Sequence, residues 1–254
     1  MNIHQFYVII AHRNEPAVYS CCAGGFEFIT KGRVTALTGL GDGIVILMSV
    51  IAFGYGMRMI ILKKPPFYFQ LIVCSVACYI LGYLFDVCEY FVTGVLSGGY
   101  LIGYLGTIGC FLFLLTAGYG YMDGIMDDRT ANMKLCRYIA LASPVFCIAL
   151  LIPNLVADVD IVTKIAYLLL WAPAIFSSYF NLKHAIIPDM GFGFVMAIRP
   201  FNIAALSFTF LQLIHLTLWN FCDWGVLLVS GILLGSSCVA MMVMADKGVE
   251  KWTL

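Results

Sequence analysis

Seven apolar segments follow one another along the chain, and each is close to the roughly 20 residues that a membrane-spanning helix needs. They lie at about residues 38–62, 68–93, 99–122, 137–157, 160–182, 200–222 and 224–245. Hydrophobic residues make up 62% of the chain and charged residues 11%, whereas a soluble domain is about half apolar and a quarter charged. We therefore expect an all-α integral membrane protein of the cell membrane, a multi-pass bundle of seven transmembrane helices in contact with the lipid bilayer.

The chain is predicted to have two parts. Residues 1–36 contain short β-prone runs, QFYVII and FEFIT, which are separated by Asn14–Glu15–Pro16 and by Gly24–Gly25. This pattern predicts an N-terminal tail outside the cytoplasm that is either disordered or folded as a small hairpin. Residues 37–254 are predicted to form the seven-helix bundle with a short C-terminal tail, because the connections between the apolar segments are short.

The basic residues predict the orientation of the bundle. Ten of them fall on the side of the loops after the first, third and fifth spans and of the C-terminus: Arg58, Lys63, Lys64, Arg129, Lys134, Arg137, Lys183, Arg199, Lys247 and Lys251. Four fall on the other side: Arg13, Lys31, Arg33 and Lys164. Because cytoplasmic loops carry an excess of Lys and Arg, we expect the N-terminus outside and the C-terminus in the cytoplasm.

Several classes of function find no support in the sequence. The formal charge is zero and no basic run is present, so we expect no nucleic-acid partner. The ten cysteines include no CxxC pair, and no Cys/His spacing predicts a metal site. The seventh span has no lysine to form a retinal Schiff base, and no protease or metalloenzyme motif occurs. We therefore expect neither an enzyme nor a cofactor.

The cysteines leave one question open. Cys21, Cys22, Cys88 and Cys222 are predicted to lie in or near the outer polar phase, whereas most of the others lie inside apolar runs. A disulfide among these four is compatible with that location, and no particular pairing is favoured.

Three spans carry polar side chains at one depth. On the second span, Tyr79, Tyr83, Asp86 and Tyr90 share a helix face, and Glu89 adjoins it. A carboxylate costs roughly 2.5 kcal/mol or more at the centre of a spanning helix, so it indicates a functional site. The predicted ligand-binding residues from the second, fifth and sixth spans are Tyr83, Asp86, Glu89, Tyr90, Lys164, Tyr167, Trp171, Gln212, His215 and Trp219.

Lys164 could pair with Asp86 or Glu89, which would lower the cost of each charge in the membrane. The alternative to a ligand pocket is a structural cluster. Tyr and Trp gather at membrane interfaces, and a single His or Gln in a span often serves a hydrogen bond between helices.

The second and third spans, with ILGYLFDVCEYF and then YLIGYLGTIGCFLFLLTAGYG, carry a family resemblance. Together they resemble the N-terminal seven-helix sensor region of bacterial histidine kinases and diguanylate cyclases. The resemblance implies a membrane sensor with its N-terminus outside and a ligand pocket near the outer face. Such proteins continue into a cytoplasmic kinase or cyclase domain, whereas this sequence ends shortly after Ala245. If the sequence is complete, a cytoplasmic partner is expected to carry the output.

The leading functional hypothesis is therefore a bacterial membrane sensor or receptor that binds a small molecule near the outer face and signals to a cytoplasmic partner. The alternatives are a small-solute transporter, or the membrane subunit of one, and a structural membrane partner without a ligand. Gly231 and Gly235 form a small-xxx-small pattern that permits close helix packing or a homodimer.

Overall fold

The computed structural model describes residues 26–93, 102–124, 133–157, 159, 161–188, 193–222 and 224–253. For residues 26–40 the description is of the backbone alone. The chain forms two units, residues 1–36 and 37–254, and each is considered by itself. In the first unit, the described residues 26–36 are helical.

The described part of the second unit is all-helical. Its elements, in chain order, are α2 (Phe26–Lys63), α3 (Phe67–Thr93), α4 (Ile102–Leu115), the π-helix η1 (Thr116–Asp123), α6 (Met133–Ala140), α7 (Ala142–Val156), α8 (Ile161–Ile186), α9 (Phe194–Trp219) and α10 (Trp224–Thr253). Seven spans among them are long and apolar enough to cross a membrane. The third span joins α4 to η1, and the fourth joins α6 to α7. The predicted seven-transmembrane-helix bundle is thus confirmed.

Two helices begin earlier than predicted. The FEFIT run is helical rather than extended, because no proline interrupts the chain between Phe26 and Lys63 and strand propensity depends strongly on context. Helix α9 begins at Phe194 rather than near residue 200, after Gly193 with a φ of 66°. Pro200 consequently lies inside α9, a position that spanning helices tolerate better than soluble ones. The QFYVII run lies outside the described residues.

Proline ends α2. Pro65 and Pro66 follow Lys64, whose φ of 47° places it in the left-handed region. The amide of Lys64 still donates to the carbonyl of Ile60 at 3.3 Å, which is the hydrogen bond expected of a residue that closes a helix. The chain then reverses at once into α3, so that α2 and α3 run antiparallel.

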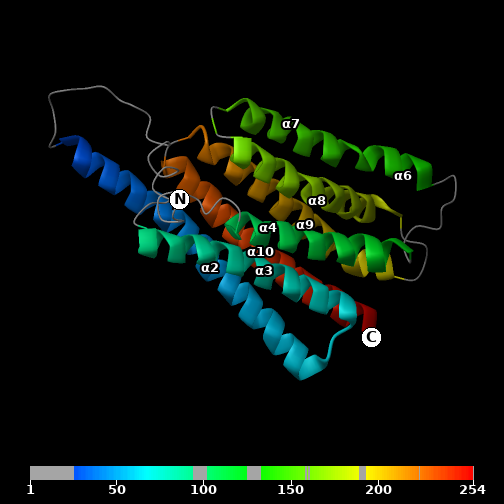
Figure 1. Ribbon diagram of the computed structural model, residues 1–254. Helices are drawn as coiled ribbons and strands as arrows, with labels where there is room; N and C mark the ends of the chain where they lie inside the picture. The colour runs from blue at the N-terminus through cyan, green and yellow to red at the C-terminus, as the bar shows by residue number, and fades with distance from the viewer. Residues whose placement is uncertain are drawn as a thin grey trace, which may run out of the picture. The chain divides into compact units, whose positions relative to one another are not determined.

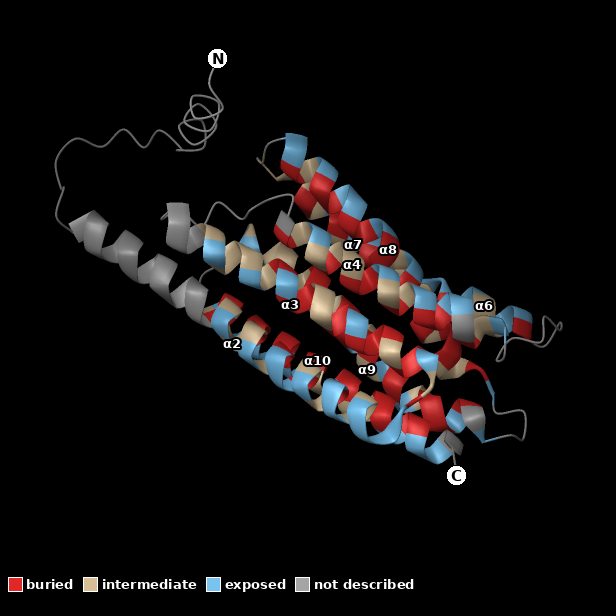
Figure 2. Ribbon diagram, turned by 60° about the horizontal axis from the view of Figure 1, so that its bottom comes forward, coloured by how far each residue is buried: buried red, intermediate tan, exposed pale blue. Residues whose placement is uncertain are grey.

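The helices form an antiparallel bundle with two opposite edges. Helix α7 forms one edge and packs on α8 and α9, whereas α2 lies at the other edge beside α3 and α10 (Figures 1 and 2). Further contacts link α3 to α4, α4 to α8, α8 to α9, α9 to α10 and α10 to α3. We call the end of the bundle at which α3 ends the Glu89 end, and the end at which α2 ends the Lys63 end.

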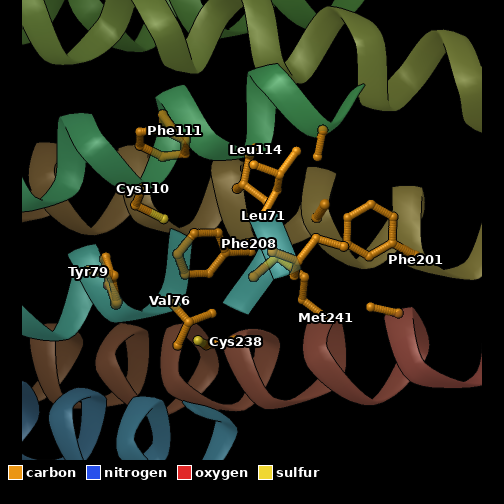
Figure 3. Close-up of a cluster of buried hydrophobic side chains, with 14 of the residues drawn as sticks. Leu71, Val76, Tyr79, Cys110, Phe111, Leu114, Phe201, Phe208, Cys238 and Met241 are labelled. Atoms are coloured by element: carbon orange, nitrogen blue, oxygen red, sulfur yellow. The ribbon is translucent and has the colours of Figure 1, made fainter. Parts of the chain in front are cut away.

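An aromatic and aliphatic layer fills the centre of the bundle. Phe208 of α9 packs edge-on against Tyr79 of α3, with ring centroids 5.2 Å apart, and also contacts Phe111 of α4. Figure 3 shows Phe208 between Cys110 and Leu114 of α4 above and Val76 and Cys238 below, with Phe111 above Cys110. All of these side chains are buried. Large apolar side chains such as Leu81 and Val156 are instead exposed on the outside, as contact with lipid requires.

Glycines bring two pairs of helices into backbone contact. A Cβ on Gly106 of α4 would lie 2.5 Å from the Cα of Gly82 on α3, so the two helices touch without a side chain between them. A Cβ on Gly231 of α10 would lie 3.0 Å from the carbonyl oxygen of Gly41 on α2. The small-xxx-small pattern of α10 therefore serves packing against α2 within this chain, because Gly235 also faces Met48 of α2.

Candidate functional site

A polar cavity of about 150 Å³ opens at the Glu89 end of the bundle. It lies among α2, α3, α4, α8 and α9, which means that five helices contribute side chains to it. Six of the ten predicted residues line it: Tyr83, Asp86, Tyr167, Gln212, His215 and Trp219. The other lining residues are Asp42, Gly103, Tyr104, Thr107, Val159, Thr163, Leu216 and Asn220.

Four of the predicted residues are not among those that line the cavity. The side chain of Tyr90 lies outside the described residues. Trp171 is fully buried, and its indole donates to the carbonyl of Cys147 on α7 at 2.9 Å. Lys164 and Glu89 are half-buried, and the described residues include no ion pair between Lys164 and Asp86. The pairing of Lys164 with one of these carboxylates stays a prediction.

His215 of α9 is held by a hydrogen bond to Ser230 of α10, and its tautomer is assigned from the partners of that serine. The Ser230 hydroxyl of α10 donates to the carbonyl of Leu227 at 2.9 Å. Its lone pair then accepts from Nδ1 of His215, which lies 2.7 Å away. With the proton on Nδ1, the lone pair of a neutral His215 is on Nε2. With this assignment, Nε2 is the ring nitrogen that can accept a hydrogen bond from a molecule in the cavity.

Asp42 of α2 faces that nitrogen. Its Oδ1 lies 3.6 Å from Nε2 of His215, which is longer than a hydrogen bond. A carboxylate and a neutral imidazole lone pair offer two acceptors and no donor. The pair is therefore complete only when a proton is added to the imidazole or when a donor enters between the two groups. Nearby, the rings of His215 and Trp219 meet edge-on, with centroids 6.4 Å apart.

Asp86 of α3 provides the second carboxylate. Gly103 of α4 leaves room for it, since a Cβ on that glycine would overlap both carboxylate oxygens and the Cγ of Asp86. Oδ1 of Asp86 is buried and has no hydrogen-bond partner in the part of the chain that the structure describes. A buried acceptor without a donor costs free energy, so a ligand that donates a hydrogen bond to this oxygen would gain binding free energy.

A hydrogen-bonded pair forms the floor of the cavity. The hydroxyl of Tyr79 on α3 donates to Oε1 of Gln212 on α9 at 2.5 Å, and both side chains are buried. The hydroxyl of Tyr83 lies 3.4 Å from that of Tyr79 and borders the cavity. Beyond Tyr79 begins the apolar layer of Phe208 and Phe111. The cavity therefore ends on this layer.

The wall on the side of α7 and α8 is a network of amides and hydroxyls. Asn220, which follows α9, donates to Oδ1 of Asn154 at 2.8 Å and to the hydroxyl of Tyr167 at 3.0 Å. Asn154 is fully buried and donates in turn to Thr217 at 2.8 Å. Tyr104 of α4 packs edge-on against Tyr167 at 5.9 Å. These contacts fix two aromatic rings at the cavity surface.

Sequence reasoning missed Asp42, although a usable signal was present. Asp42 is the only carboxylate within the first span, which otherwise is apolar from Gly41 to Arg58. A carboxylate within a spanning helix is costly and therefore indicates a functional site, and this argument applies to Asp42 as it does to Asp86. Tyr104 and Thr107 were missed because nothing in the sequence indicates which face of the third span meets the cavity.

A second polar cluster lies at the Lys63 end. Asp123, the last residue of η1, accepts from Nζ of Lys183 at 2.5 Å and from Nε2 of His184 at 3.2 Å. Burial alone would raise the pKa of Asp123, but the hydrogen bonds and charges of His184 and Lys183 outweigh it and hold the pKa below its usual value. The cluster ties η1 to the end of α8. It is separated from the cavity by the apolar layer.

The described residues contain no group of three or more His, Cys, Asp or Glu side chains that could hold a metal ion. Cys88 and Cys222 carry free thiols, and Cys21 and Cys22 lie outside the described residues. Comparisons with protein-family models, with curated proteins and with solved structures found no match for this chain. The site therefore has to be interpreted from its own geometry.

Proposed function

We propose that this protein is a membrane sensor that binds a small molecule in the polar cavity at the Glu89 end and signals through the opposite end of the bundle. The observation that carries the proposal is the convergence of Asp42, Asp86 and His215 from three helices on one cavity. A spanning bundle normally pairs such groups with one another, because they are costly in lipid. Here Oδ1 of Asp86 has no hydrogen-bond partner among the described residues, and Nε2 of His215 lies 3.6 Å from Asp42, too far for a direct hydrogen bond.

The family resemblance supports the same function. The two stretches that resemble bacterial sensor regions, one in α3 and one in α4, supply Tyr83, Asp86, Gly103, Tyr104 and Thr107 to the cavity. In the proposed orientation, which follows the excess of basic residues at the Lys63 end, the cavity faces the outside and that end faces the cytoplasm. A cytoplasmic signalling protein is the proposed recipient.

A ligand acts as a signal only when it binds two arrangements of the bundle with different affinity. The path from the cavity to the Lys63 end runs along α4 into η1. Gly103, Tyr104 and Thr107 of α4 contact the cavity, and Asp123 ends η1 in an ion pair with Lys183. A tilt of α4 therefore reaches the opposite end through a single continuous stretch of helix.

Transport is the competing function, and the apolar layer argues against it. Tyr79, Phe111 and Phe208 are fully buried between the cavity and the Lys63 end. A solute that crossed the bundle would have to displace these packed rings. In a sensor, by contrast, the same layer keeps the two ends sealed from each other while the helices shift.

The test uses purified protein in lipid nanodiscs. A library of small water-soluble molecules is screened for compounds that raise the thermal unfolding temperature. Hydrogen exchange at residues 116–123 is then measured with and without each hit. We expect at least one hit that changes exchange in η1, and we expect both effects to disappear in Asp42→Asn but to persist in Glu250→Gln, an exposed carboxylate at the Lys63 end.

Proteoliposomes separate the two functions. A sensor moves none of the hit compound across the membrane, so uptake of the compound into vesicles that contain the protein would contradict the proposal and support the transporter. A hit that stabilises the protein equally in Asp42→Asn would place the binding site elsewhere.

A further inference from the structure

The ligand class follows from the charge of the cavity. Among the described residues that line it, the carboxylate and imidazole side chains are those of Asp42, Asp86 and His215, and none is a lysine or an arginine. With both carboxylates ionised, the formal charge of these three is negative whether His215 is neutral or protonated. In a bundle surrounded by lipid, such a charge attracts a cation and repels an anion.

The aromatic rings around the cavity suit the same kind of guest. Tyr83, Tyr104, Tyr167 and Trp219 all line it, and the edge-on packing of Tyr104 on Tyr167 fixes two of these rings. Aromatic faces carry partial negative charge and attract organic cations within about 6 Å of the ring centroid. A hydrated inorganic ion makes little use of such a surface, whereas an ammonium group on a short hydrocarbon does.

The free acceptors select a cation that bears N–H groups. Oδ1 of Asp86 lacks a donor among the described residues, and Nε2 of His215 lies too far from Asp42 for a direct hydrogen bond. His215 is 97% buried, since its exposed fraction is 3%, so its nitrogen has little access to bulk water. A primary ammonium offers three donors, which a quaternary ammonium lacks.

The volume limits the size of the guest. A cavity of about 150 Å³ is comparable to engineered cavities that hold one molecule of benzene. The guest is thus on the order of five to eight non-hydrogen atoms. Gly103 contributes to this space, since any side chain there would fall on the Asp86 carboxylate.

We propose that the cavity binds a small protonated primary amine, with its ammonium group between Asp86, Asp42 and His215 and its hydrocarbon part against the tyrosine rings. The proposal rests on the proposed function in that it names the ligand of the same site. The amine is either a dissolved metabolite or the ethanolamine head group of a lipid, because both present the same primary ammonium.

The test compares four compounds that each carry a short unbranched hydrocarbon chain and differ in the polar group: n-butylamine, n-butanol, butyrate and butyltrimethylammonium. Binding to the wild-type protein is measured by calorimetry in phosphatidylglycerol nanodiscs at neutral pH, and benzylamine is included as a larger primary amine. We expect the primary amines to bind at least tenfold more tightly than the alcohol, the anion and the quaternary cation. If the alcohol or the anion binds as tightly as n-butylamine, or if neither amine binds, the proposal is wrong.

Variants then assign the site. Asp86→Asn is expected to weaken amine binding at least tenfold, and Glu250→Gln, a matched loss of a carboxylate at the Lys63 end, is expected to leave it unchanged. Equal binding by both variants would overturn the assignment. The selectivity of the wild-type protein remains a test even if Asp86→Asn does not fold.

Two further measurements are needed. One distinguishes a lipid head group from a dissolved metabolite as the source of the amine, and the other tests the sensor proposal and the amine proposal separately. In nanodiscs that also contain phosphatidylethanolamine, competition from the head group is expected to weaken n-butylamine binding only if the natural ligand is a lipid. If amines bind without changing hydrogen exchange in η1, the proposed amine site is supported and the proposed sensor function is contradicted. A change of exchange caused by a neutral or anionic hit would retain the sensor and reject the amine.

Discussion

The carboxylate of Asp86 on α3 lies directly against the Cα of Gly103 on α4, in the space that a side chain would occupy. The two helices are close enough there for a single methyl group to close the binding site. Gly103→Ala is therefore expected to displace the carboxylate. The ligand concentration needed for the same rise in unfolding temperature is expected to increase at least tenfold. The cost to stability is expected to be about 1–3 kcal/mol, as for other overpacked sites.

Gly54→Ala is the matched control for that experiment, since a Cβ on Gly54 meets nothing within 4 Å and the residue is exposed. It is expected to leave binding unchanged and to stabilise α2 slightly, because Ala favours a helix by up to about 1 kcal/mol over Gly. Thermal unfolding with and without ligand measures both effects. Full ligand response in Gly103→Ala would show that Asp86 does not contribute to binding.

The ion pair of Asp123 with Lys183 makes the stability of the protein depend on pH in the acidic range. The folded-state pKa of Asp123 is depressed below its unfolded value of about 3.9, so the pair contributes fully above that pH. The contribution is lost as the pH falls through the lower folded-state pKa. Unfolding temperatures measured from pH 6 to pH 2 are expected to fall less steeply for Asp123→Asn than for the wild type. Parallel profiles would contradict this assignment.

Lys183→Met tests the same cluster from the other side. The Lys183 side chain is 4% exposed, and its removal leaves Asp123 with His184 as its remaining partner. Loss of one member of a buried pair typically costs about 3–5 kcal/mol. We expect a lowered unfolding temperature and faster hydrogen exchange in η1, since this pair fastens η1 to α8. An unchanged exchange rate would mean that other contacts hold η1.

Two fully buried asparagines are expected to respond differently to replacement by leucine. Asn154 donates to the carbonyl of Leu150 and to Thr217, and it accepts from Asn220. Asn202 donates only a long hydrogen bond of 3.4 Å, and its Oδ1 has no partner in the described part of the chain. Asn154→Leu is expected to destabilise by about 1–2 kcal/mol, and Asn202→Leu by less. Chemical denaturation in detergent micelles ranks the two, and the reverse order would contradict the hydrogen-bond assignment.

The contact between Gly231 and Gly41 predicts the effect of a bulky residue on α10. Gly231→Val is expected to separate α10 from α2 and to lower stability by about 1–3 kcal/mol, because the group in its way is backbone. The oligomeric state, measured by light scattering, is expected to remain that of the wild type. Gly225→Ala, whose Cβ meets nothing within 4 Å, is the control. A change of oligomeric state in Gly231→Val alone would instead assign this face to a dimer.

The seven spans were predictable because lipid imposes a length of about 20 apolar residues on each of them. The same regularity indicated which faces of α3 and α9 line the cavity. Asp86 on α3 and Gln212 and His215 on α9 line the cavity as their helical spacing indicates. The exact ends of the helices were less predictable, since neither Phe26 nor Phe194 is preceded by a residue that sequence reasoning recognised as a cap.

Residues whose role depends on neighbouring helices were not predictable. Trp171 shares a face with Tyr167 in sequence, but it turns to α7 and bonds to Cys147. Lys164 differs by one position from Thr163, and on a helix one position is a rotation of about 100°, which leaves Thr163 and not Lys164 in the cavity. Asp42 reaches His215 only because Gly41 and Gly231 bring α2 against α10.

The backbone contact between Gly82 and Gly106 has a mechanical consequence. Side chains separate the backbones of most packed helices, and they accommodate small displacements by changing rotamer. Here the two peptide backbones meet directly, so this crossing has no such compliance. Helices α3 and α4 must therefore pivot about a fixed fulcrum rather than slide past each other. Because Asp86 lies one turn beyond that fulcrum and Asp123 lies at the far end of the α4–η1 arm, a small movement at the cavity is magnified at the other end of the bundle.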